Sequence, residues 1–79
     1  MNKLFTVEVS NELVEIYLND EGINILIDKL NSLKKSRNNE HEHLMTPDIG
    51  GNEITSIKQN LDSKMELIHH LKLVYWKDN

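Results

Sequence analysis

The spacing of apolar residues changes twice along this chain, from every second residue to a helical repeat and back again. Apolar side chains alternate with others over residues 3–9 and over residues 13–18, and the polar residues Ser10, Asn11 and Glu12 separate the two runs. Alternation of this kind is typical of a strand with one face more buried than the other. The first part of the sequence therefore predicts a β-hairpin around a short polar turn.

A helix is predicted directly after the hairpin. Asn19 and Asp20 provide N-cap side chains, and Glu21 follows where the positive end of a helix dipole favours a carboxylate. Basic residues over 34–37 complement the negative end of the dipole, and we prefer this explanation to an anion site. The helix is expected to lie on a sheet through one apolar side, which consists of Ile23, Leu26, Ile27, Leu30 and Leu33.

Two further strands are predicted in the second half of the chain. The first covers residues 40–46 and is ended by Pro47, which cannot donate to a β-ladder. A strong turn signal over 48–52 and a partly ordered excursion over 53–63 precede a long final strand over 65–76. The order β-β-α-β-β predicts one α+β domain over 1–79, a four-stranded, mostly antiparallel sheet with one helix packed on a face.

One helix leaves the other face of such a sheet uncovered. Ile68, Val74 and Trp76, together with outward-facing residues of the hairpin, would then form an exposed apolar patch, which usually marks an interaction surface. Alternatively, the 53–63 excursion folds over this face. Both arrangements remain open at the level of sequence.

Composition limits the compartment and the class of partner. The 79 residues include no cysteine, which excludes thiolate chemistry and cysteine-based zinc sites and fits a reducing compartment. No signal peptide or membrane-spanning run is apparent, so we expect a cytoplasmic protein without a membrane partner. A net charge of −4 disfavours nucleic acid and favours a basic or amphiphilic protein partner.

Catalytic motifs are absent from the sequence. It contains no G-x-S-x-G, no P-loop and no G-x-G-x-x-G, and nothing selects one acid/base pair among the 13 carboxylates. Gly50 and Gly51 fit a tight turn better than an anion-binding nest. We therefore expect no enzyme, no catalytic residues and no cofactor.

Four histidines raise the alternative of a small metal-binding protein or metal-dependent enzyme. His41 and His43 share one strand face, and either His69 or His70 could lie beside them on a neighbouring strand. An H-x-H spacing alone is a weak zinc signal, so structural histidines are favoured and no metal ligand is assigned. A third alternative is a structural homodimer in which the long final strand pairs with its own copy.

Three segments resemble a family of small bacterial immunity proteins from polymorphic toxin systems, the immunity protein 32 family. The segments are EIYLNDEG from Glu15, HEHLMTPDIGGNEI from His41 and LIHHLKLVYW from Leu67, so the resemblance spans roughly Leu13 to Trp76. The family pattern reads H-x-HLM-[ST]-P-x-W-GG-x-E-L, followed by a strand that ends in an aromatic residue. Ile49 stands where the family has Trp, which puts an aromatic contact by that loop in doubt.

The resemblance implies a protein that binds and silences a cognate toxin domain, and occlusion of the toxin is the mechanism that we expect. Acidic groups around the turn would steer the encounter with a basic toxin. The residues predicted to bind the toxin are Glu40, Glu42, His43, Asp48, Ile49 and Glu53.

Overall fold

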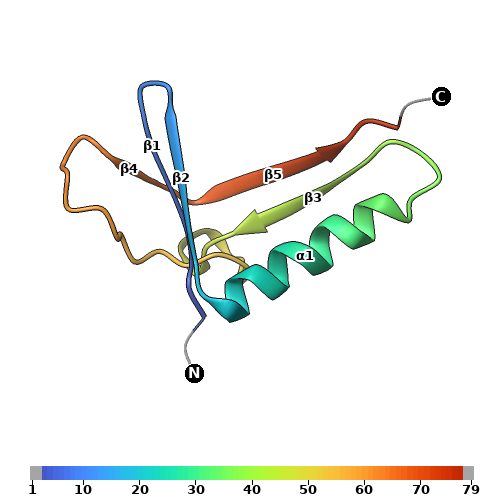
Figure 1. Ribbon diagram of the computed structural model, residues 1–79, viewed down its shortest axis with the longest axis horizontal. Helices are drawn as coiled ribbons and strands as arrows, with labels where there is room; N and C mark the ends of the chain where they lie inside the picture. The colour runs from blue at the N-terminus through green and yellow to red at the C-terminus, as the bar shows by residue number, and fades with distance from the viewer. Residues whose placement is uncertain (1–2, 78–79) are drawn as a thin grey trace.

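The computed structural model describes residues 3–77, which form one α-helix, one short 3-10 helix and five strands (Figure 1). This α+β character and the predicted hairpin are confirmed. Asn11 has a positive φ of 51° in the hairpin turn, as a tight connection requires. The elements are β1 Phe5–Ser10, β2 Leu13–Leu18, α1 Asp20–Lys34, β3 Glu40–Met45, the short 3-10 helix η1 Pro47–Ile49, β4 Glu66–Ile68 and β5 His70–Tyr75.

The strands form two antiparallel sheets, in the orders β2-β1-β4 and β3-β5, so the predicted single four-stranded sheet is wrong. The cause is a division of the predicted 65–76 strand at His69. Val7 of β1 pairs with Ile68 before this residue, whereas Met45 of β3 pairs with His70 after it. The carbonyl of His69 accepts a hydrogen bond from the Thr46 amide at 3.0 Å. Because the two halves of this apolar run pair with different strands, they belong to separate sheets.

The hydrophobic core lies where the two sheets meet the helix. Phe5, Val7, Leu44 and Ile54 are buried in one cluster, with each side chain at most 2 % exposed. The odd-numbered residues Phe5 and Val7 of β1 thus face the apolar core, as their alternation predicts, whereas Thr6 and Glu8 are buried on the opposite face of the strand. Partly buried side chains complete the cluster: Leu18, Ile25, Leu26, Ile68, Leu71 and Leu73.

The helix α1 begins and ends close to the predicted positions, but much of its apolar side is not covered. Leu33 is buried and Leu26 packs against the core, whereas Ile23, Ile27 and Leu30 are 42 to 49 % exposed. The prediction that all five residues lie on the sheet is therefore wrong. Besides a contact with β2, α1 lies against a sheet of only two strands, β3 and β5, which is too narrow to cover so wide an apolar side.

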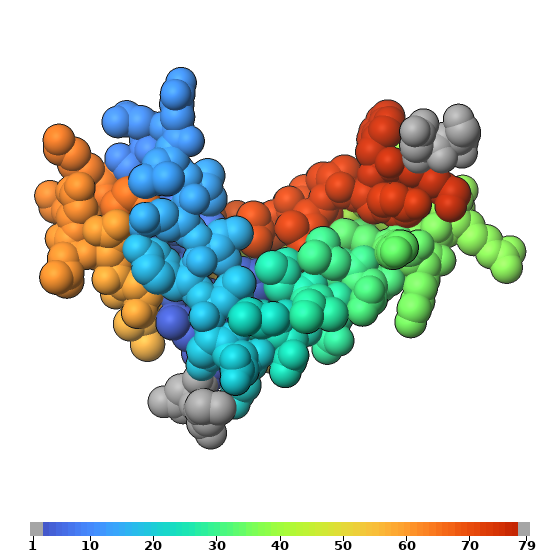
Figure 2. Space-filling view, viewed as in Figure 1, coloured from blue at the N-terminus to red at the C-terminus, as the bar shows by residue number. Residues whose placement is uncertain are grey.

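The molecule is open in shape, with extents of 42 × 32 × 22 Å. Figure 2 shows its surface hollowed between the β1–β2 hairpin on one side and β5 with α1 on the other. Within the part of the chain that the structure describes, no helix is long and apolar enough to cross a membrane.

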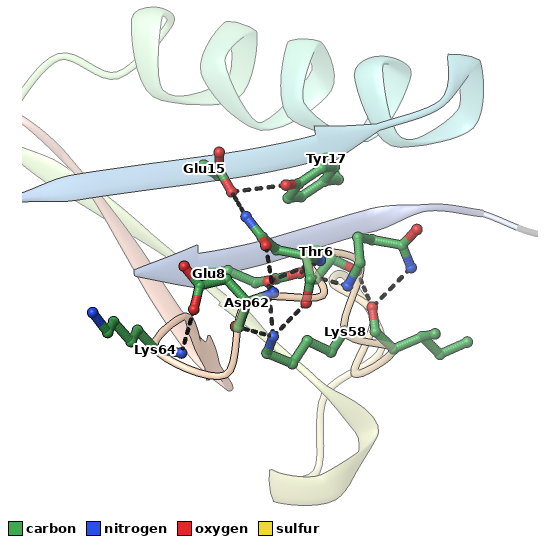
Figure 3. Close-up of polar contacts among 10 residues, drawn as sticks. Thr6, Glu8, Glu15, Tyr17, Lys58, Asp62 and Lys64 are labelled. Atoms are coloured by element: carbon green, nitrogen blue, oxygen red, sulfur yellow. Dashed lines mark hydrogen bonds and ion pairs between the residues drawn. The ribbon is translucent and has the colours of Figure 1, made fainter. Parts of the chain in front are cut away.

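Residues 50–65 contain no helix or strand and follow the polar face of the hairpin (Figure 3). The Thr6 hydroxyl donates to the Ile57 carbonyl at 3.1 Å, and the Gln59 amide donates to the Glu8 carboxylate at 2.6 Å. The excursion therefore buries Thr6 and Glu8. It does not cover Val74 and Trp76, which remain 61 and 77 % exposed.

Candidate functional site

The six residues predicted to bind a partner fall into three places. Glu42 and Glu53 line one groove. Asp48 and Ile49 lie exposed in the neighbouring η1 turn. Glu40 and His43 are exposed on β3, but strand alternation directs them to opposite faces. The structure therefore brings Glu42 and Glu53 together and separates His43 from both.

The groove lies between one flank of α1, strand β3 and the loop that follows η1, and has a volume of about 500 Å³. Three carboxylates and one ammonium group line it. The Lys29 ammonium lies 3.4 Å from the Glu42 carboxylate, which leaves Asp28 and Glu53 as additional negative charges. The groove therefore carries an excess of negative charge. Its lining residues are Ile25, Asp28, Lys29, Ser32, Glu42, Asn52 and Glu53.

Glu53 is held in the groove by a backbone hydrogen bond. Its carboxylate accepts a hydrogen bond from the Met45 amide at 3.0 Å, at the end of β3. This hydrogen bond lowers the pKa of Glu53 from its ordinary value, and it outweighs the partial burial that would raise the pKa. The position of this negative charge in the groove is therefore set by the backbone of β3.

The turn that carries Asp48 and Ile49 is fixed by Thr46, which is fully buried. The Thr46 carbonyl accepts hydrogen bonds from the Ile49 and Gly51 amides at 3.1 and 3.0 Å. Its hydroxyl lies 2.8 Å from Nδ1 of His69. The Thr-Pro and Gly-Gly parts of the sequence pattern thus build a defined turn at the rim of the groove.

Steric constraints explain why glycine occupies both positions 50 and 51 of this turn. Gly50 has a φ of 96°, in the left-handed region that side chains with a Cβ disfavour. A Cβ on Gly51 would lie 2.5 Å from the carbonyl oxygen of Met45. The turn therefore depends on glycine at both positions.

Three histidines meet on the face of the β3–β5 sheet that α1 does not cover. Nδ1 of His43 lies 2.7 Å from Nε2 of His70, and the His41 ring packs edge-on against His43 with 4.8 Å between centroids. His69 is separate, since it contacts Thr46. Desolvation, with smaller contributions from His41, His70 and Lys72, lowers the pKa of His43. Among residues 3–77, no group of three His, Asp or Glu side chains is arranged to hold a metal ion.

Sequence reasoning missed Asp28 and Lys29, the helix side chains of the groove. Their positions on the polar side of the predicted helix indicate exposure, but no local signal says that β3 lies beside them. The sequence does not indicate that Glu42 faces α1, because this orientation depends on the pairing of β3 with β5. The groove is thus a product of tertiary structure.

Comparison with known proteins gives no relative for this chain. No protein-family model, no curated protein and no solved structure matches it.

Proposed function

We propose that this chain is an immunity protein, which binds a cognate toxin domain and neutralises it by occlusion. The observation that carries the proposal is the acidic groove, in which Asp28, Glu42 and Glu53 surround about 500 Å³ of open space. The sequence resemblance supports the same class of protein. A basic segment of a protein is the ligand that such a groove fits best.

The groove is suited to a lysine or arginine side chain of the partner. Glu53 is held by the Met45 amide, so its carboxylate needs little reorganisation when a cation arrives. Asp28 is exposed at the edge of the groove and can draw a basic partner toward it. Lys29 already neutralises Glu42, so the partner's cation would be attracted mainly by the other two carboxylates.

The η1 turn would add an apolar contact beside the charged one. Ile49 is 47 % exposed in a turn that Thr46 fixes, and Asp48 next to it adds a further negative charge. Interfaces commonly combine a central apolar anchor with a charged rim. A toxin domain seated on this face would have its own basic surface covered, as occlusion requires.

Co-expression tests the proposal. The toxin domain encoded beside this gene is expressed in a bacterial host with the wild-type chain, with Asp28→Lys or with Glu12→Lys. Glu12 is exposed in the hairpin turn, so its replacement makes the same charge change outside the groove. We expect growth with the wild-type chain and with Glu12→Lys, and reduced growth with Asp28→Lys. Continued toxicity despite well-expressed, folded wild-type chain would refute the proposed function.

A further inference from the structure

We propose that this chain forms a symmetric homodimer in which β5 pairs antiparallel with β5 of a second copy and the exposed flanks of the two α1 helices pack together. The proposal concerns a surface other than the acidic groove and does not depend on toxin binding. It rests on exposed area, on an open strand edge, on an uncovered helix flank and on the order of residues in β5.

The chain exposes more surface than a monomer of its size should. Its accessible area is 5757 Å², whereas a monomeric protein of this mass is expected to expose about 4,900 Å². The difference of about 800 Å² is what one partner contributes to a standard protein interface. The radius of gyration is likewise large, at 13.5 Å against about 12 Å for a compact chain of this length.

The sheet formed by β3 and β5 has an open edge at β5. Within the described chain β5 pairs only with β3, and two-stranded sheets are marginally stable without further strands. The free edge borders the hollow seen in Figure 2, so a strand from another molecule has access to it. Pairing of β5 with its copy would produce a four-stranded sheet, β3-β5-β5-β3.

The helix presents its uncovered apolar flank on the same side as this edge. Lys29 and Ile25 lie on the flank that borders β3 through the acidic groove. Ile23, Ile27 and Leu30 recur at helical spacing on the other flank, and all three are exposed. Because the groove flank borders β3 and α1 also contacts β5, we infer that this second flank lies on the β5 side of the helix. In the dimer these flanks would meet across the two-fold axis, on one face of the four-stranded sheet.

The sequence of β5 favours one register for this pairing. Side chains directly opposite each other in an antiparallel pair point to the same face of the sheet. The two-fold axis that relates the two β5 strands must therefore pass beside one residue of β5, which lies opposite its own copy. An axis at Lys72 would set two lysines against each other, and an axis at Val74 would place Lys77 against Leu71 on the apolar face. An axis at Leu73 avoids both, with Leu73 opposite its own copy.

This register also covers the exposed residues of the other face. Val74 would lie opposite the aliphatic part of Lys72, and Trp76 opposite His70. Both Val74 and Trp76 are largely exposed in a single copy. The arrangement therefore accounts for the apolar residues on both faces of β5.

Sedimentation velocity tests the dimer over about 1 to about 100 µM protein. The variants are Ile27→Lys in the helix contact, Val74→Lys in the strand contact and Leu61→Lys as a control that is fully exposed elsewhere. We expect twice the chain mass for the wild type and for Leu61→Lys, and the single-chain mass for the other two. All three positions are exposed in one copy, so circular dichroism should show an unchanged fold.

A monomeric wild type throughout this range would overturn the proposal, as would a dimer that persists in both Ile27→Lys and Val74→Lys. The register is tested by single cysteines, because the natural chain has none. Leu73→Cys should form a disulfide-linked dimer under mild oxidation, since the two residues face each other. Val74→Cys should not, because its copies would lie about 7 Å or more apart. Linking of Val74→Cys but not of Leu73→Cys would contradict the Leu73 axis.

Discussion

Glu8 is fully buried, and its carboxylate is held by backbone amides about fifty residues further along the chain. Gln59 and Asn60 donate to it at 2.6 and 3.2 Å, and the Lys58 ammonium lies 3.9 Å away. A buried carboxylate requires such partners because loss of water is otherwise costly. Glu8 therefore fastens the 50–65 excursion to β1, as Figure 3 shows.

Replacement of Glu8 by Ala should destabilise the fold by about 3 kcal/mol, because two amides lose a charged acceptor. Urea denaturation monitored by circular dichroism measures this change. Glu12→Ala, in the exposed hairpin turn, is the matched control and should change stability by less than about 0.5 kcal/mol. Equal stabilities of the two variants would show that Glu8 does not hold the excursion.

Glu53 should make the stability of the protein depend on pH. Because folding lowers its pKa, ionised Glu53 stabilises the fold at pH values above the unfolded-state pKa, and this contribution disappears as the pH falls through the folded-state pKa. Between about pH 7 and about pH 3 the wild type should therefore lose more stability than Glu53→Gln. Urea denaturation at several pH values checks the slopes, with Glu12→Gln as a matched substitution in the exposed hairpin turn. Parallel curves for wild type and Glu53→Gln would contradict the assignment.

At the scale of elements, α1 is anchored at its first turn. Oδ1 of Asn19 accepts hydrogen bonds from the Gly22 amide at 3.0 Å and from the Leu4 amide at 2.9 Å. One side chain thus caps the helix and ties it to the segment before β1. The sequence indicates the cap, because Asn at this position precedes a helical repeat, but it does not indicate the bond to Leu4.

Loss of the Asn19 cap should lower stability by about 1 to 2 kcal/mol in Asn19→Ala. Asn19→Asp keeps the acceptor oxygen and should remain close to the wild type. Asn24→Ala removes an exposed asparagine from the same helix without removing a cap, so it should be nearly neutral. Thermal unfolding of the three variants checks this order, and a similar loss in Asn24→Ala and Asn19→Ala would contradict it.

The elements that sequence predicts well are those specified by local patterns. The hairpin, α1 and β3 follow from alternation, helical repeat and capping, and their positions are confirmed within one or two residues. The division of the last strand depends instead on which strands pair before and after His69. Helical periodicity likewise shows where the apolar side points, but not how wide the sheet beneath it is. Long-range pairing therefore decides what local patterns leave open.

At the scale of the whole molecule, α1 separates two surfaces with different chemistry. One flank lines the acidic groove with Asp28 and Lys29, and the other exposes Ile23, Ile27 and Leu30. Of the predicted partner-binding residues, Glu42 and Glu53 line the groove. The charge and the turn signal of this segment predict these two residues, whereas their place in the groove is set by tertiary contacts. Self-association through the apolar flank would leave the groove of each copy accessible. The two proposals can therefore be tested separately.

The proposed function is tested by isothermal titration calorimetry of the purified chain with a candidate toxin domain from a neighbouring gene. We expect binding of one toxin domain per chain, with affinity reduced about tenfold or more by Asp28→Lys and unchanged by Glu12→Lys. Absence of binding by the folded wild-type chain, or equal affinities for wild type and Asp28→Lys, would contradict the claim that the acidic groove binds the toxin.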